Sequence, residues 1–228
     1  MRLRLIALLL AGVAGCGTQP ATDGGRDEEP ALSFEETLNA AEQGNADAQL
    51  ALSHLYYHGR GVPKDLVEAA KWYRKAAEQG HAEAQVYLGW KYYLGEGVPQ
   101  SYAEAVKWYR KAADQGDASG QVELGRMYYH GEGVPKDLVE AAKWYRKAAE
   151  QGDASAQHTL GGVYHRGDGV PKDDVEACAW CSVAATNGDS YARKYLPKAK
   201  ARLAPEQLVA AQKRATELIE QLSANKGK

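Results

Sequence analysis

One stretch of twenty residues, GVPKDLVEAAKWYRKAAEQG, occupies positions 61–80 and recurs without change at positions 133–152. The two copies belong to a longer repeat spaced by 36 residues, because Pro recurs at 63, 99, 135 and 171 and Trp at 72, 108, 144 and 180. A unit of this length cannot bury its apolar face alone, whereas stacked neighbours bury a continuous core. The period therefore predicts an array of stacked units.

Each unit contains signals for two helices. In the first copy a helix is expected at about 46–57, between Asn45 at the N-cap position and Gly59, which can take the left-handed conformation that ends a helix. The Gly-Val-Pro sequence at 61–63 cannot continue a helix and predicts a turn. The N-cap position of the later copies is occupied by His81, Asp117 and Asp153.

The second helix of each unit opens with Asp65, followed three residues later by Glu68. This spacing predicts a capping box, in which both side chains accept hydrogen bonds from backbone N–H groups that would otherwise lack a partner. The later copies have Ser101 and Glu104, Asp137 and Glu140, and Asp173 and Glu176. An amphipathic stripe follows at Ala69, Trp72, Tyr73 and Ala76, so the sequence predicts an all-α chain of α-hairpins.

The unit is similar to known helical repeats. Its Leu-Gly-x-x-Tyr sequence resembles the tetratricopeptide repeat, but that repeat has a period of about 34 residues. The G-x-G-V-P-x-D loop, the A-x-x-W-Y-R-K-A-A-E-Q-G ending and the 36-residue spacing resemble the Sel1-like repeat family. The resemblance implies a right-handed superhelical solenoid with a concave groove lined mainly by the first helices. It also implies a scaffold or adaptor role, because the family mostly binds proteins.

The repeat spacing divides the folded part of the chain. Four Sel1-like repeats are expected at 45–80, 81–116, 117–152 and 153–188. Residues 32–44 match a second helix without its Trp and predict an N-terminal capping helix. Residues 189–223 predict a partial repeat, which departs from the pattern at Pro197, and a C-terminal capping helix ending near Leu222. Such terminal helices cover the apolar face of an end repeat.

The N-terminal residues are expected to be separate from the repeats. Arg2 and Arg4 precede an apolar run that is too short to span a bilayer and is typical of a secretory signal over residues 1–15. The Val-Ala-Gly-Cys sequence ending at Cys16 resembles the lipobox of bacterial lipoproteins, which makes Cys16 the expected lipidation site; the alternative is an ordinary signal with an incidental cysteine. Residues 16–31 are rich in Gly, Pro and acids and predict a flexible tether.

By the same resemblance, the chain is expected in the bacterial cell envelope, held to the membrane by its lipid anchor. The absence of Asp after the cysteine favours the outer membrane, facing the periplasm. The net charge of −2 gives no basic excess of the kind that nucleic-acid binding requires. No G-x-S-x-G sequence, P-loop or complete Ser-x-x-Lys motif set occurs, so neither an enzyme nor a cofactor is expected.

The favoured function is therefore an envelope-anchored scaffold that binds a protein partner in the groove. The alternatives are a periplasmic hydrolase acting on cell-wall or β-lactam substrates, and an envelope regulator without a stable partner.

Recognition is expected where the copies differ, because residues common to all copies maintain the stack. Four positions of the first helix vary (47, 51, 54 and 58 in the first copy), and their spacing places them on one helical face. Tyr87, Trp90 and Arg126 are the strongest candidates, because Trp, Tyr and Arg dominate the energetics of interfaces. The predicted partner-binding face also includes His54, His58, Leu94, His130 and Arg166. The alternative is a solvated surface without a ligand.

Two pairs of residues could carry other chemistry. His54 and His58 could present two imidazoles to zinc, but a third ligand such as His130 or Asp47 would be needed, so a polar groove wall is expected instead. Cys178 and Cys181 form a C-x-x-C sequence on the buried stripe. Without strands around it a thioredoxin-like role is not expected, which leaves two buried thiols or one local disulfide.

Overall fold

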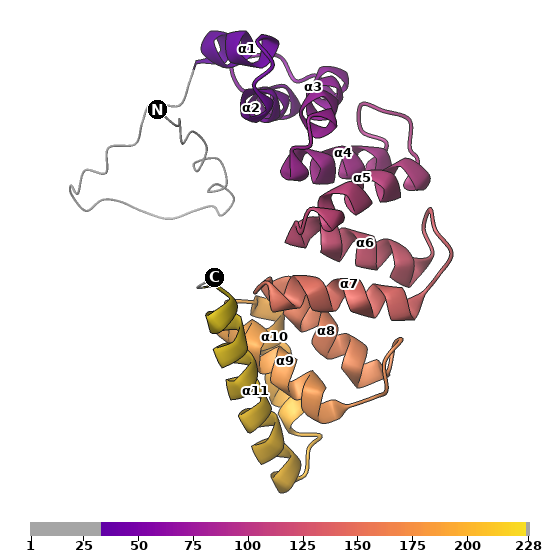
Figure 1. Ribbon diagram of the computed structural model, residues 1–228, viewed down its shortest axis with the longest axis vertical. Coiled ribbons are helices and arrows are strands. Elements are labelled where there is room, and N and C mark those ends of the chain that lie inside the picture. The colour runs from indigo at the N-terminus through magenta and orange to yellow at the C-terminus, as the bar shows by residue number, and fades with distance from the viewer. Residues whose placement is uncertain (1–32, 227–228) are drawn as a thin grey trace, which may run out of the picture.

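The computed structural model describes residues 33–226, which are helical apart from the connecting turns and loops (Figure 1). The predicted signal at 1–15, the lipidation site Cys16 and the tether at 16–31 lie outside the described residues. Within the described range, no helix is long and apolar enough to cross a bilayer. The helices in chain order are α1 (Phe34–Glu42), α2 (Ala46–His58), α3 (Leu66–Glu78), α4 (Ala82–Leu94), α5 (Tyr102–Asp114), α6 (Ala118–His130), α7 (Leu138–Glu150), α8 (Ala154–Arg166), α9 (Asp174–Thr186), α10 (Ser190–Lys200) and α11 (Pro205–Lys226).

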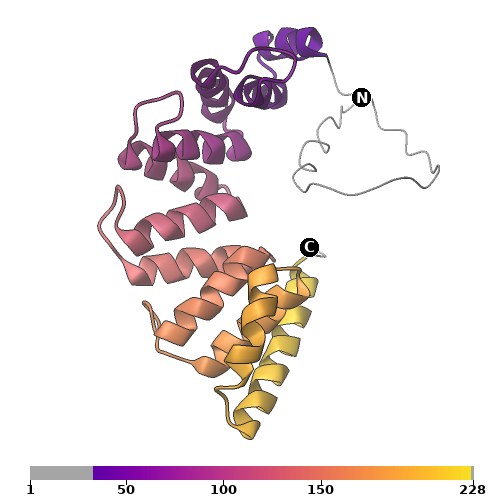
Figure 2. The same cartoon turned by 180° about the vertical axis from the view of Figure 1, so that it is seen from behind.

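The helices pair in chain order, and the pairs stack into a curved array (Figures 1 and 2). In each repeat the first helix packs on the second, and the second helix also contacts the first helix of the next repeat. The apolar clusters therefore cross repeat boundaries, as where Leu50 of α2 and Trp108 of α5 share one cluster with Tyr73 and Leu88. The predicted all-α array of stacked helix pairs is confirmed.

The first helices begin and end as the sequence predicts. Asn45, Asp117 and Asp153 each accept a hydrogen bond from the backbone N–H three residues later, and the His81 ring does the same for Ala84. Gly59 ends α2 in the left-handed conformation, with φ of 69°.

The predicted capping boxes of the second helices are only half formed. The Asp65 carboxylate accepts from the N–H groups of Val67 and Glu68, at 2.9 and 3.0 Å, as expected. The Asp65 N–H, however, donates to the carbonyl of Tyr56 at 2.9 Å. The loop folds back onto the first helix, so this donor already has a partner, and Glu68 pairs with Lys71 instead.

A complete capping box occurs at the start of α1. Ser33 accepts from the N–H of Glu36, and the Glu36 carboxylate accepts from the N–H of Ser33.

A buried glutamine in each first helix ties neighbouring pairs together. Gln85 Nε2 donates to the carbonyl of Ala77 in the last turn of α3 (3.0 Å), and its Oε1 accepts from Gln115 at the end of α5 (2.8 Å). The same two bonds recur at Gln49, Gln121 and Gln157. Each of these carbonyls also accepts a hydrogen bond from the N–H of the glycine three residues later, so the bonds of the amide chiefly satisfy the buried glutamine itself.

The loop inside each repeat rests on the second helix of the preceding repeat. Gly97 has a φ of +73°, and a Cβ there would lie 1.9 Å from the carbonyl oxygen of Leu66. The equivalent distances are 2.4 Å from Gly133 to Tyr102 and 2.1 Å from Gly169 to Leu138. Only glycine permits this approach of one backbone to another.

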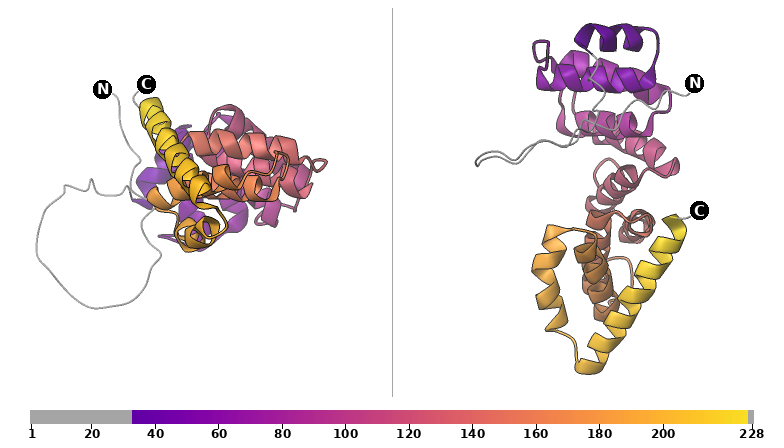
Figure 3. Two further views of the ribbon diagram at one scale, coloured as in Figure 1. Left: turned by 90° about the horizontal axis from the view of Figure 1, so that it is seen from below. Right: turned by 90° about the vertical axis from the view of Figure 1, so that its left-hand side faces the viewer.

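The C-terminal end of the array is covered by two helices. α10 and α11 both pack on α9, and Figure 3 shows them on different sides of the last repeat, joined by a sharp turn. α11 adds Ala215, Leu218 and Leu222 to the core, as the capping-helix prediction requires. α10 continues through Pro197 and ends shortly afterwards at Lys200.

We expect Gly97→Ala to destabilise the fold strongly and Gly116→Ala to do so mildly. Both residues have positive φ, +73° and +90°, but a Cβ on Gly116 would meet nothing within 4 Å. The shared backbone strain costs about 1 kcal/mol, and the clash at Gly97 raises the loss to about 3 kcal/mol or more. Urea unfolding followed by circular dichroism measures both values. Equal losses would show that the loop contact does not stabilise the array.

Candidate functional site

The variable positions of the first helices lie outside the core. In α2, α4, α6 and α8 none of them is buried, whereas the neighbouring positions equivalent to 48, 49, 52 and 53 are buried in every copy. The variable set comprises positions 47, 51, 54, 58, 83, 87, 90, 94, 119, 123, 126, 130, 155, 159, 162 and 166. This distribution agrees with the predicted division between constant, core-facing residues and a variable outward face.

Four predicted residues form a continuous aromatic strip across the first two repeats. The rings of His58 and His54 are nearly parallel, with centroids 6.4 Å apart. His54 meets Tyr87 edge to face at 4.7 Å, and Tyr87 meets Trp90 edge to face at 5.3 Å. Tyr73 lies beneath, stacked on Tyr87 at 5.4 Å. The aromatic strip, His58–His54–Tyr87–Trp90, is therefore supported by the core.

His54 is held neutral by its surroundings. Burial, followed by the repulsion of positive charge on His58, Lys91 and Arg60, lowers the pKa of His54 to about 4. Its Nδ1 lies at hydrogen-bond distance from the Tyr73 hydroxyl, 3.1 Å away. Burial also lowers the pKa of the more exposed His58. The described residues contain no group of three or more His, Cys, Asp or Glu side chains that could hold a metal ion.

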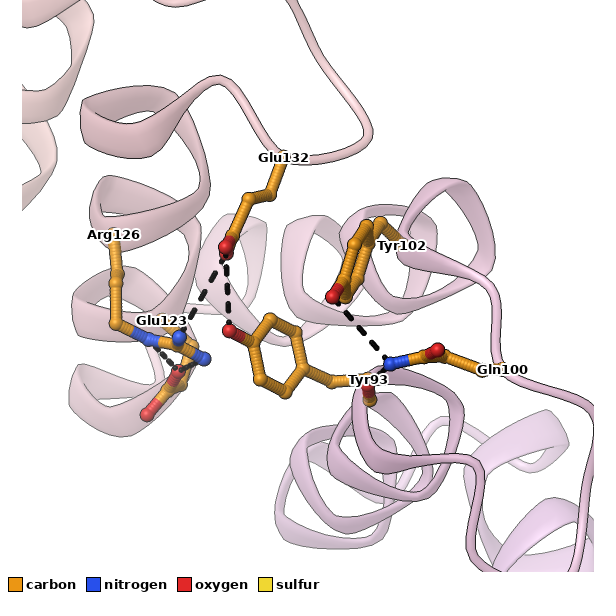
Figure 4. A network of polar contacts seen from close by, with 6 residues as sticks. All are labelled: Tyr93, Gln100, Tyr102, Glu123, Arg126 and Glu132. Atoms are coloured by element: carbon orange, nitrogen blue, oxygen red, sulfur yellow. Dashed lines mark hydrogen bonds and ion pairs between the residues drawn. The ribbon is translucent and has the colours of Figure 1, made fainter.

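Arg126, the third of the strongest candidates, lies against Tyr93. Its guanidinium is 4.3 Å from the Tyr93 ring centroid and donates twice to Glu123, at 2.7 and 2.8 Å. Glu132 lies 3.9 Å away and accepts a hydrogen bond of 3.4 Å from the Tyr93 hydroxyl. Figure 4 shows this network, in which Arg126 is engaged by its own chain.

The network around Arg126 is one of three similar clusters at successive repeat boundaries. These clusters were not predicted from the sequence. In each, a tyrosine near the end of one first helix donates to an acid in the next loop, and a cation from the next first helix covers the ring. The cation comes from a different helix position each time. The clusters are Tyr57–Glu96–Lys91, Tyr93–Glu132–Arg126 and Tyr129–Asp168–Arg166, with cation-to-ring distances of 3.6, 4.3 and 5.8 Å.

A sequence signal for these clusters exists. Tyrosine recurs at 57, 93 and 129, and an acid recurs at 96, 132 and 168, so the two residue types share the period of the repeat. The missing information was that position 57 of one unit meets position 96 of the next. Only the stacking geometry supplies it.

The remaining predicted residues lie at the ends of the first helices. Leu94 is 56% exposed. The exposed His130 packs edgewise on Tyr129, with 5.1 Å between ring centroids. The exposed Arg166 donates to Asp168 at 2.5 Å. None of these three belongs to the aromatic strip.

Cys178 and Cys181 are buried, as predicted, and are free thiols rather than a disulfide. Burial raises the pKa of both and that of Cys181 to about 11. A thiol that stays protonated at neutral pH is a poor nucleophile. The structure therefore assigns these cysteines to packing.

We expect His54→Gln to reduce the loss of stability that occurs on acidification. Unfolded His54 titrates near 6.5 and the folded residue near 4, so the unfolded state binds the additional proton between these pH values. The contribution is complete above pH 6.5 and falls as pH drops towards 4. Its size is at most about 3 kcal/mol, and less because the ring is partly exposed. Unfolding free energies measured at several pH values test this.

The matched control is His58→Gln, because His58 is the exposed neighbour in the same strip. This change should alter the pH dependence much less. If both variants retain the slope of the unaltered chain between pH 6.5 and 4, His54 is not protonated on unfolding as described.

These features define a helical-repeat protein with an outward aromatic strip. The chain belongs to the Sel1 repeat family, because the family's sequence model matches residues 46–81, 82–117, 118–153 and 154–189. The matched units begin one residue after the boundaries expected from the sequence.

Three known proteins are similar to parts of the chain. The secretory immunoglobulin A-binding protein EsiB of Escherichia coli O6:H1 strain CFT073 is 43% identical over 76 residues, which is 33% of this chain and 14% of EsiB. The crystal structure of c5321, described as a protective antigen of uropathogenic E. coli with an SLR fold, is 42% identical with a TM-score of 0.75, over 82% of this chain and 41% of that chain.

A Sel1 repeat protein from Oxalobacter formigenes is 38% identical with a TM-score of 0.69, over 83% of this chain and 75% of that chain. The chain therefore spans less than half of EsiB and c5321 but most of the Oxalobacter protein.

Proposed function

We propose that this chain is a scaffold of the bacterial cell envelope that binds a protein partner through the aromatic strip. The observation that carries the proposal is the packing of Tyr87 and Trp90. Both are partly exposed, and Tyr87 rests on the buried Tyr73. A side chain fixed in this way loses little conformational freedom on binding, and Trp and Tyr dominate interface energetics.

The chemistry of the strip favours an apolar or aromatic partner segment. Its histidines have lowered pKa values and are neutral at neutral pH, so the strip carries no charge of its own. Leu94, at the end of α4, adds an exposed apolar side chain on the same helix face. A neutral partner surface avoids leaving a buried charge without a counter-ion.

The relatives support binding rather than catalysis. EsiB is named for binding secretory immunoglobulin A, and c5321 is described as an antigen. Immunoglobulin A is not proposed as the partner of this chain, because the matched segment is a small part of EsiB. What the likeness supports is the use of Sel1 repeats to bind a protein.

We expect Trp90→Ala to weaken partner binding at least tenfold, because truncating a central aromatic anchor costs about 2 kcal/mol or more. A photo-cross-linking amino acid placed at position 90 in cells identifies the partner. Affinity for that partner is then measured with the purified chain and with Trp90→Ala, after circular dichroism has confirmed equal helix content.

The matched control places the same cross-linker at Val67, which is 52% exposed on the second helix of the first repeat. Position 67 should not capture the partner. Equal capture at both positions, or an unchanged affinity of Trp90→Ala, would refute binding through the strip.

We further propose that lipidation of Cys16 anchors the scaffold to the outer membrane, facing the periplasm. The support is the Val-Ala-Gly-Cys sequence after a short apolar run. Two or more acyl chains give stable anchoring, whereas one gives marginal binding.

We expect Cys16→Ala to move the protein from the detergent phase to the aqueous phase in a phase-partition assay. Retention in the detergent phase would contradict lipidation at this residue.

A further inference from the structure

The fourth repeat keeps the glycine that accommodates an aromatic ring but has lost the ring. In the second repeat a Cβ on Gly89 would lie 2.5 Å from Tyr109, and in the third a Cβ on Gly125 would lie 2.9 Å from Tyr145. Each glycine therefore provides the space in which a tyrosine ring of the second helix lies. In the fourth repeat Gly161 is retained, but Cys181 replaces the tyrosine.

A second large side chain is missing at the same place. Gly162 occupies the position of Trp90 in the second repeat and Arg126 in the third. The structure has a cavity of about 440 Å³ here, and Gly161, Gly162, Ala177 and Cys181 form part of its wall. Its volume is within the range of ligand-binding pockets in proteins.

The wall of the cavity is apolar at the glycines and also contains positively charged side chains. Arg166, Lys198 and Arg202 line it together with one acid, Asp174. Asp174 is engaged by His165, whose Nδ1 lies 2.5 Å from Oδ1, and Arg202 lies 2.6 Å from the other ring nitrogen of His165. Because Arg166 is paired with Asp168, the two other cations, Lys198 and Arg202, remain beside one carboxylate that already has a partner.

Two of these cations have capacity for an anion. Lys198 has no carboxylate within ion-pair distance in the described part of the chain. Arg202 uses one nitrogen on His165 and retains further N–H donors. Tyr195 of α10 also lines the cavity, and its ring stacks with His158 at a centroid distance of 6.1 Å. Guanidinium and ammonium groups of this kind bind carboxylates through charge-assisted hydrogen bonds.

We propose that this cavity binds an aromatic carboxylate. The ring occupies the space of the missing tyrosine beside Gly161, and the carboxylate is held by Lys198 and Arg202. A free aryl acid and the C-terminal residue of a peptide ending in Phe or Tyr share this chemistry. The site lies where α10 and the turn after it meet the last repeat, and it does not depend on the aromatic strip of the first two repeats.

Ligand-observed NMR titrations of the full-length chain test the proposal with phenylpropionate. We expect it to bind at least tenfold more tightly than propionate, which lacks the ring, and benzyl alcohol, which lacks the carboxylate. Acetyl-Gly-Gly-Phe with a free C-terminus, compared with its C-terminal amide, distinguishes the sources. A peptide acid that binds more tightly than phenylpropionate identifies a peptide ligand, whereas tighter binding of phenylpropionate identifies a small aryl acid.

Cys181→Tyr restores the ring present in the second and third repeats and should abolish binding. Cys178→Ala is the matched control, because Cys178 is the other buried cysteine of α9, does not line the cavity and replaces an alanine of the first and third repeats. This control should bind normally. Lys198→Gln, at an exposed position, should weaken phenylpropionate binding about tenfold and leave benzyl alcohol binding unchanged.

Undiminished binding by a folded Cys181→Tyr variant would overturn the proposal, as would equal binding of the three small probes. If Cys181→Tyr does not fold, Lys198→Gln decides: unchanged phenylpropionate affinity refutes the site. Absence of binding by both phenylpropionate and the peptide acid at millimolar concentration also refutes it.

Discussion

The stacking of this array depends on one amide group per repeat. Each buried glutamine of a first helix donates to a carbonyl at the end of the preceding second helix and accepts from the residue that caps the second helix of its own repeat, as Gln85 does with Ala77 and Gln115. Glutamine amides buried at these boundaries without hydrogen-bond partners would oppose stacking. The two hydrogen bonds remove this penalty and fix the register of one pair on the next. The glycine loops, the aromatic strip and the cavity all take their positions from that register.

Several residues of the variable outward face also take part in contacts between neighbouring repeats. Each boundary places a tyrosine hydroxyl against a loop acid, and each needs a cation to balance the acid. Lys91, Arg126 and Arg166 meet this need from three different positions of the first helix. Two of them, Arg126 and Arg166, belong to the variable outward face. The identity of the residue at these two positions is therefore partly set by the need to place a cation beside the loop acid of the same chain. Tyr87 and Trp90 have no such role and are the clearer candidates for contact with a partner.

The fourth repeat departs from the others in one region of space. Cys181 and Gly162 lie on different helices, but both replace large side chains next to Gly161, and α10 and the turn after it bring Lys198 and Arg202 to the same cavity. From the sequence, Cys181 was considered only as one cysteine of a C-x-x-C pair. In the structure, the important consequence of this cysteine is that no tyrosine ring fills the space beside Gly161.

The sequence alone determined the class of fold. It also determined which side of each first helix faces the core and which side faces outward. A 36-residue period, N-cap residues such as Asn45 and terminating residues such as Gly59 are local signals, and the Trp and Tyr stripe needs only helical periodicity. Contacts between units were decided by tertiary structure. Asp65 donates to Tyr56 instead of completing a capping box, Tyr57 reaches Glu96, and His54 joins Tyr87, because each of these pairs depends on how one helix lies on another. Periodicity specifies which face of a helix is buried, but only the packed array specifies which residue of the neighbouring unit that face meets.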